Sequence, residues 1–111
     1  MKLEELVPPL ELCKLIPKGE FEDSCFVWVA LPNGREYRVS KRTVYLEAQL
    51  KCIPAPTLEE IMANMPYCRV YKKTRGFYVA VKDKDRFVDG NAATAALKLW
   101  LKLKGIKICE Q

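Results

Sequence analysis

The chain has 111 residues, of which 50% are hydrophobic and 30% charged, and its formal net charge is +5. This length fits a single domain, and the balance of apolar and charged residues is that of a soluble folded protein rather than a disordered one. The chain contains no histidine, so the usual base of Ser-His-Asp and Cys-His catalysis is missing and no catalytic residues are predicted.

Neither a targeting segment nor a membrane span is predicted. The first ten residues, "MKLEELVPPL", combine Glu4 and Glu5 with two prolines where a signal peptide needs an uninterrupted apolar run. The longest apolar stretch, Ala92–Leu103, is too short for a membrane span and contains Lys98 and Lys102. We therefore expect a cytoplasmic protein that does not interact with a membrane.

The first half of the chain predicts a short helix followed by a β-hairpin. The helix is expected near Pro9–Ile16, because a proline followed by acidic and apolar residues is typical of a helix start. The segments "SCFVWVAL" and "REYRVS" then flank Pro32–Gly34, and Asn-Gly is the strongest short-range hairpin signal. Both faces of Cys25–Leu31 are apolar, so we expect a central strand that is covered on each side. In Thr43–Cys52 the residues "VYL" favour a strand and "LEAQLK" favours a helix. A strand and a helix are therefore both possible for this segment.

A capping box predicts the start of a helix in the second half. Thr57 is a good N-cap, and Glu60 three residues later completes the box. Apolar residues then recur at helical spacing, at Leu58, Ile61, Met62 and Met65. Pro66 is expected to end this helix.

A second hairpin is predicted after this helix. Its strands are Cys68–Lys73 and Gly76–Lys82, joined through Thr74–Gly76, and a shorter strand around Arg86–Val88 follows. Along the second strand, one face holds Phe77, Val79 and Val81, and the other holds Tyr78, Ala80 and Lys82.

A longer helix is predicted over Ala92–Lys104, which is rich in strong helix formers. Asn91 supplies cap chemistry at its start, and Gly105 suits the position after its end. Its polar residues fall on one narrow strip, formed by Asn91, Thr94, Lys98 and Lys102. Because the rest of the circumference is mostly apolar, we expect deep burial against a sheet, with Trp100 as a core anchor rather than a ligand platform.

These elements predict an α+β fold in one domain, residues 1–111. We expect an antiparallel sheet of about four to six strands, built from the two hairpins and packed with about three helices. The segments 8–41 and 56–88 both have the pattern of a helix followed by a hairpin, since "PPLELCKLIP" is similar to "PTLEEIMANMP". The C-terminal helix, 91–104, follows these two weakly similar halves.

The second half resembles small proteins of phages and prophages. The likeness covers residues 54–105 and rests on "PAPTLEEIMANMP", a basic aromatic hairpin and "GNAATAALKLWLKLKG". Some of these proteins are described as phage α-β-α sandwich proteins of unknown biochemical function. The resemblance implies an α-β-α sandwich and supplies no catalytic residues.

The second hairpin also holds the candidate binding residues. Residues 56–111 contain eleven Lys and Arg against six Asp and Glu, whereas residues 1–55 contain eight of each. The candidate nucleic-acid contacts are Arg69, Lys72, Lys73, Arg75, Tyr78 and Lys82. Such cations can neutralise phosphates, and Tyr71 or Tyr78 can offer a stacking face. Lys and Arg also keep an exposed hairpin soluble and protect an edge strand from pairing, so both interpretations stay open.

The remaining motifs do not match known sites. "RGFYVAVK" begins like the RNP1 motif of RNA-recognition domains but departs from it after Phe77. "DKDRFVDG" has Phe87 and Val88 where a calcium loop needs a ligand and a glycine.

The cysteines form no C-x-x-C pair, which argues against a metal site. They are Cys13, Cys25, Cys52, Cys68 and Cys109. We expect each of them to be a small buried hydrophobe, and we expect neither a metal nor a cofactor. The sequence thus predicts a small intracellular non-enzymatic protein of phage or prophage type, which is an interaction or accessory protein with no assignable activity and an unknown protein partner. The alternative is an accessory nucleic-acid-binding protein that uses the basic hairpin.

Overall fold

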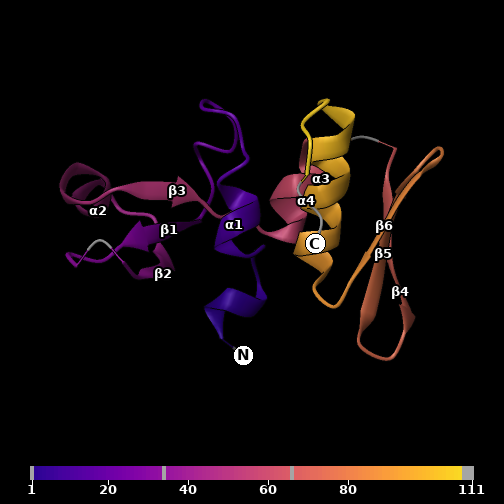
Figure 1. Cartoon of the computed structure of the whole chain (residues 1–111), viewed down its shortest axis with the longest axis horizontal. Coiled ribbons are helices and arrows are strands. Elements are labelled where there is room, and N and C mark those ends of the chain that lie inside the picture. Colours follow the sequence, from indigo (N-terminus) through magenta and orange to yellow (C-terminus); the bar gives the residue numbers. More distant parts are fainter. Residues whose placement is uncertain (1, 34, 66, 109–111) are drawn as a thin grey trace.

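A computed structural model describes residues 2–33, 35–65 and 67–108. Its three layers follow the longest axis of the molecule, which extends over 42 Å. A layer of helices lies between two antiparallel sheets (Figure 1). Each sheet has three strands within the described residues. Buried side chains of the helices and of both sheets belong to one hydrophobic cluster.

The first sheet contains the predicted first hairpin. Its strands are β1 (Phe26–Ala30), β2 (Tyr37–Lys41) and β3 (Cys52–Pro54), in the order β2-β1-β3. The prediction of a central strand is confirmed for β1, which pairs with β2 on one side and with β3 on the other. Val27 and Val29 are buried on one face, and Trp28 packs against the main core on the other.

Local chemistry determines the loops of this sheet. The side-chain oxygen of Asn33 accepts the backbone N–H groups of residues 35–36, which closes the turn between β1 and β2. Gly34, part of the predicted turn, lies outside the described residues. The segment left open by the sequence, 43–52, forms the helix α2 (Val44–Gln49) before β3 begins.

The second sheet consists of the predicted second hairpin and the strand after it. Its strands are β4 (Arg69–Thr74), β5 (Phe77–Lys82) and β6 (Asp85–Asp89), in the order β4-β5-β6. β5 pairs antiparallel with both neighbours, so β4 and β6 are edge strands. The register of β4 shifts between Lys72 and Thr74, which places a bulge-like irregularity near the end of this edge strand.

The three helices that the sequence predicts begin at the expected positions, and a short 3₁₀ helix that it does not predict precedes them. The 3₁₀ helix η1 (Leu3–Glu5) precedes α1 (Leu10–Cys13), and α3 (Leu58–Ala63) and α4 (Ala92–Leu103) follow later in the chain. The capping box is confirmed, because Thr57 accepts the N–H of Glu60 and the Glu60 carboxylate accepts the N–H of Thr57. Asn91 caps α4 by accepting the N–H of Thr94 at 3.0 Å. Pro66, the predicted end of α3, lies outside the described residues.

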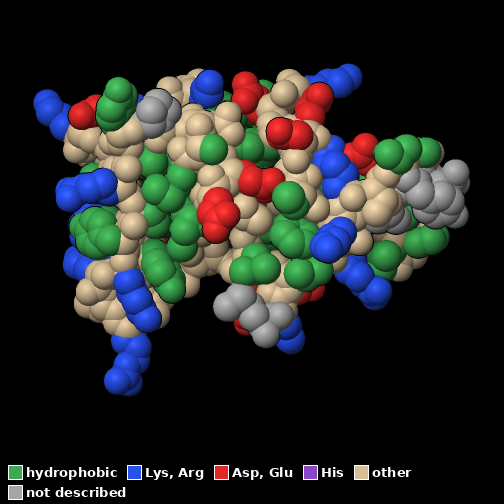
Figure 2. Space-filling model, turned by 180° about the vertical axis from the view of Figure 1, so that it is seen from behind, with side chains coloured by type: hydrophobic (Ala, Val, Ile, Leu, Met, Phe, Trp, Pro, Cys, Tyr) green, Lys and Arg blue, Asp and Glu red, His purple; other side chains and the backbone are tan. Residues whose placement is uncertain are grey.

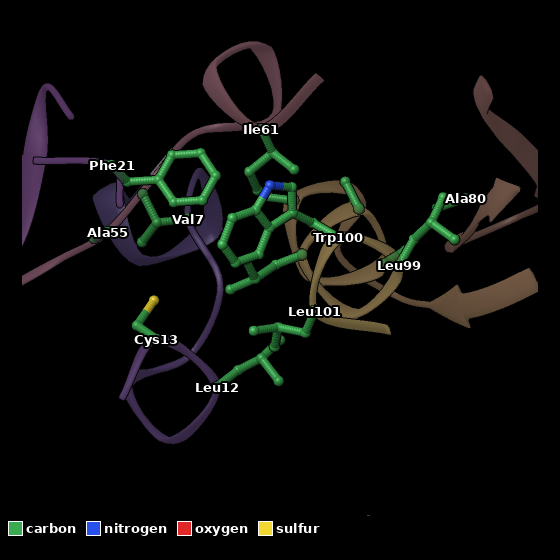
Figure 3. Packing of buried hydrophobic residues seen from close by; sticks show 14 of the residues in the cluster. Val7, Leu12, Cys13, Phe21, Ala55, Ile61, Ala80, Leu99, Trp100 and Leu101 are labelled. Carbon is green, nitrogen blue, oxygen red and sulfur yellow. The ribbon is translucent and has the colours of Figure 1, made fainter. Parts of the chain in front are cut away.

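Helix α4 is buried on most of its surface. Its buried residues are Ala93, Thr94, Ala95, Ala96, Leu97, Leu99, Trp100 and Leu101. Leu99 points toward Ala80 of β5, and Trp100 points the opposite way, toward Phe21 (Figure 3). The rings of Phe21 and Trp100 lie 4.9 Å apart at a tilt of 58°. Trp100 is therefore the core anchor that the sequence predicts, whereas Thr94 is buried instead of belonging to an exposed polar strip.

The segment before α1 connects the first sheet to α4. The carbonyl of Pro8 accepts the indole N–H of Trp28 at 3.1 Å and lies 3.5 Å from the thiol of Cys13. On the other side, the side-chain amide of Asn91 donates to the carbonyl of Glu5 at 2.9 Å. One stretch of chain thus links β1, α1 and the start of α4.

The α+β class is confirmed, but the layers differ from the expected α-β-α sandwich. The six strands of the described residues form two sheets instead of one, and α1, α3 and α4 lie between them, whereas α2 lies at the outer end of the first sheet (Figure 1). The wide apolar arc of α4 is the physical reason, because a single sheet covers only one side of a helix. The other side of α4 is buried against Phe21 and the neighbouring helices.

Replacing Trp100 by alanine removes the largest of the fully buried side chains. We expect Trp100→Ala to lower the free energy of unfolding by about 3–5 kcal/mol, because transfer free energy and packing are lost together. Leu103 on the same helix is exposed and serves as the control. Leu103→Ala should change this free energy by less than about 1 kcal/mol. Urea unfolding followed by circular dichroism measures both, and equal losses would contradict a central position for Trp100.

Candidate functional site: the outer face of the second sheet

The two faces of the second sheet have different surroundings. Register partners in an antiparallel sheet point to the same side, as do residues two positions apart along a strand. The partners Val70, Ala80 and Phe87 pack into the core beside α4. No helix or strand of the described residues lies against the opposite face, which forms one end of the molecule (Figure 1). We call this opposite side the outer face.

The outer face carries aromatic, aliphatic and arginine side chains. By register, its residues are Arg69 and Tyr71 of β4, Phe77, Val79 and Val81 of β5, and Arg86 and Val88 of β6. Val81 lies between the two arginines, and Val79 lies between Tyr71 and Val88. The arginines therefore occupy one end of the face, and the aromatic rings lie toward the turn between β4 and β5.

The apolar side chains of the outer face are partly exposed. Tyr71 is 44% exposed, Phe77 51% and Val88 43%. Val79 is 0% exposed although it lies outside the main core cluster, and its register partners on the outer face are Tyr71 and Val88. Figure 2 shows hydrophobic side chains among Lys and Arg side chains along the left margin, where the second sheet lies. The outer face is thus a small apolar surface with a cationic border.

The aspartates of these strands lie on the side of α4 together with Lys72 and Lys82, whereas the two arginines lie on the outer face. By register, Asp85 and Asp89 of β6 lie on the side of α4. Asp89 pairs there with Lys98, with 3.3 Å between the carboxylate and the ammonium group. Within the described strands, the outer face carries Arg69 and Arg86 but no aspartate or glutamate. Both charged side chains of the outer face of the described strands are therefore cationic, which favours anionic partners.

The candidate residues predicted from the sequence do not all meet on one face. On the side of α4 lie Lys72, Tyr78 and Lys82. Arg69 is exposed on the outer face, Lys73 is exposed at the register shift, and Arg75 is exposed in the hairpin turn. Arg75 therefore borders the aromatic end of the outer face.

Phe77, Arg86 and Val88 belong to the outer face but were not among the candidate residues predicted from the sequence. Alternation along β5 already placed Phe77 with Val79, but the contribution of β6 depends on its register. The two-residue turn at 83–84 was the sequence feature that could have predicted this register, because it places Lys82 opposite Asp85. With this register, Arg86 and Val88 lie on the outer face.

A surface pocket of about 550 Å³ lies beside the first sheet. Its lining includes Lys18, Glu20, Arg42, Glu47 and Cys52. The Arg42 guanidinium donates to the carbonyls of Phe21 and Ser24 and pairs with Glu47. Arg42 thus stabilises the loop before β1 and its contact with α2, which is a structural role.

The described cysteines have pKa values above that of an ordinary thiol. Burial raises the pKa of the Cys13 thiol to about 12. Burial is also the main cause that raises the pKa of Cys52 and of Cys68. The negative charge of Glu60 is the main cause that raises the pKa of Cys25. A raised pKa lowers the thiolate fraction at neutral pH, so none of these described thiols has the environment of an activated nucleophile.

The prediction that every cysteine is a buried hydrophobe is correct for Cys13 and wrong for Cys25, which is exposed. Cys52 and Cys68 are half-buried, and Cys109 lies outside the described residues. Cys25 directly precedes β1, and its backbone N–H donates to the Glu60 carboxylate at 2.9 Å.

Two kinds of feature are absent from the described residues. No three His, Cys, Asp or Glu side chains are grouped there as ligands of a metal ion. No helix in residues 2–33, 35–65 or 67–108 combines the length and the apolar character that a membrane crossing requires.

Comparison with known proteins assigns no family to the chain. Models of protein families, curated proteins and solved structures gave no match. The resemblance to phage and prophage proteins stays a prediction for that reason.

Replacing Glu60 by glutamine should make the Cys25 thiol more reactive. The change removes the negative charge that raises the pKa of Cys25, so the pKa falls and the thiolate fraction at a given pH rises. Glutamine keeps the capping box. The control is Glu59→Gln, an exposed carboxylate of the same helix turn. Iodoacetamide labelling at pH 8, followed by mass spectrometry of the Cys25 peptide, measures the rate. Equal rates in both variants would contradict this influence of Glu60.

Proposed function

We propose that this chain is a non-enzymatic accessory protein that binds nucleic acid through the outer face of its second sheet. The supporting observation is that the outer face of the described strands carries Arg69 and Arg86 and no carboxylate, whereas Asp89 lies on the side of α4. An exposed positive surface attracts phosphates. Exposed rings beside these cations are suited to contact bases.

The spacing of the two arginines suits a phosphate backbone. Arg69 and Arg86 lie on edge strands with β5 between them, so their Cα atoms are separated by about 10 Å, or two strand spacings. Two long side chains at this distance can contact different phosphates of one strand. Each phosphate contact on a single strand contributes about 0.7 to the slope of log K against log salt. Two such contacts give a slope of about 1.4, which predicts modest binding that weakens about sevenfold between about 50 and 200 mM salt.

A protein partner is the second candidate for the same face. Tyr71, Phe77 and Val88 expose apolar surface together, and exposed apolar patches often mark interaction sites. The arginines at one end of this patch favour an anionic partner, which is why nucleic acid is proposed first.

The non-enzymatic role, the cytoplasmic location and the relationship to phage proteins are inferred mainly from the sequence. A non-enzymatic role is supported by the lack of histidine and by the raised pKa values of the described cysteines. A cytoplasmic location and a relationship to phage and prophage proteins stay predictions, and neither supplies an activity.

Arg69→Ala should weaken nucleic-acid binding and lower its salt dependence. Loss of one phosphate contact reduces the slope of log K against log salt by about 0.7 for a single strand and about 0.9 for a duplex. Arg38→Ala is the matched control, because Arg38 is an exposed arginine on the edge strand β2 of the first sheet. Fluorescence anisotropy with labelled single-stranded and duplex DNA between about 50 and 200 mM salt measures both quantities.

Two results would contradict the proposed function. One is the absence of binding to either DNA at low salt. The other is an equal loss of affinity in Arg69→Ala and Arg38→Ala, since non-specific attraction by net charge would explain that result without the outer face.

A further inference from the structure

The aromatic side chains distinguish the outer face from a simple cationic surface. Tyr71 on β4 and Phe77 on β5 are both about half exposed. Tyr71 lies opposite Val79, two residues along β5 from Phe77. The two rings are therefore diagonal neighbours on adjacent strands, with backbones roughly 7–8 Å apart. Both side chains expose part of their surface to solvent on the outer face.

Cations border these rings at both ends. Arg69 lies two residues before Tyr71 on the same strand, on the same face. Arg75 lies in the hairpin turn, two residues before Phe77, and is exposed. A chain that crosses the outer face along β4 therefore meets a cation, two rings and another cation in succession.

We infer that the outer face binds single-stranded nucleic acid, with bases stacked on Tyr71 and Phe77 and phosphates paired with Arg69 and Arg86. This inference rests on the proposed function and names the class of nucleic acid. Stacking needs the flat face of a base, which single strands expose. A duplex presents its phosphates and groove edges, so only the arginines of the outer face can contact it.

A second copy of the chain fits this face less well. In a symmetric dimer the same surface meets itself. Because the outer face of the described strands has no carboxylate, the arginines of one copy would find no opposite charge on the same face of the other. Phosphates, in contrast, complement both arginines.

Three probes of equal length separate stacking from charge attraction. They are labelled oligothymidylate, the same backbone with abasic sites, and a duplex. We expect the wild-type chain to bind oligothymidylate at least about fivefold more tightly than the abasic strand, since stacking of one base contributes at least this factor. Tyr71→Leu and Phe77→Leu should each reduce oligothymidylate affinity by about fivefold or more and leave abasic binding unchanged.

The control variant is Tyr37→Leu, which replaces a tyrosine on the edge strand of the other sheet. It should change none of the three affinities, and circular dichroism verifies that each variant is folded. If an aromatic variant fails to fold, the comparison of oligothymidylate with the abasic strand on the wild-type chain decides the question.

The outcomes distinguish the inference from the proposed function. Equal affinity for all three probes, with binding still weakened by Arg69→Ala, overturns the inference and keeps nucleic-acid binding. No binding to any probe overturns both. A dimer in analytical ultracentrifugation that Phe77→Leu dissociates also overturns the inference, because a second copy would then occupy the outer face.

Discussion

The burial of α4 on two opposite sides is the constraint on which the rest of the structure depends. Leu99 packs toward Ala80 of the second sheet, and Trp100 packs toward Phe21 and Ile61 on the other side (Figure 3). A helix with so little polar surface is stable in water only between two layers. The sheets therefore lie at the two ends of the molecule, and α4 covers only one face of the second sheet.

This arrangement also explains how the outer face obtains its charge. Asp89 lies on the covered side, where Lys98 of α4 pairs with it. Arg69 of β4 and Arg86 of β6 lie on the face that points away from α4, because successive side chains along a strand point to alternate faces. Val79 remains buried there without a helix above it, and Tyr71 and Val88 flank it. The side chains that flank Val79 on the outer face thus also belong to the surface proposed for binding.

Local chemistry made much of the fold predictable from the sequence. The capping box at Thr57 and the turn at Asn33 are recognisable because their partners lie within three residues. The division into two sheets was not predictable in this way, since alternation in a strand shows which residues share a face but not which layer covers it. The candidate site depends on register for the same reason. Arg69 was found from its charge, whereas Arg86 and Phe77 join it only once β5 is paired with both neighbours.

The most direct measurement is the solvent accessibility of matched aromatic residues in the dilute, unliganded protein. Hydroxyl-radical footprinting with mass spectrometry compares Phe77 with Phe21, two side chains of equal intrinsic reactivity. The account predicts rapid oxidation of Phe77 on the uncovered sheet and protection of Phe21 beside Trp100. Equal protection of both phenylalanines would show that another layer covers the second sheet, and would contradict the account.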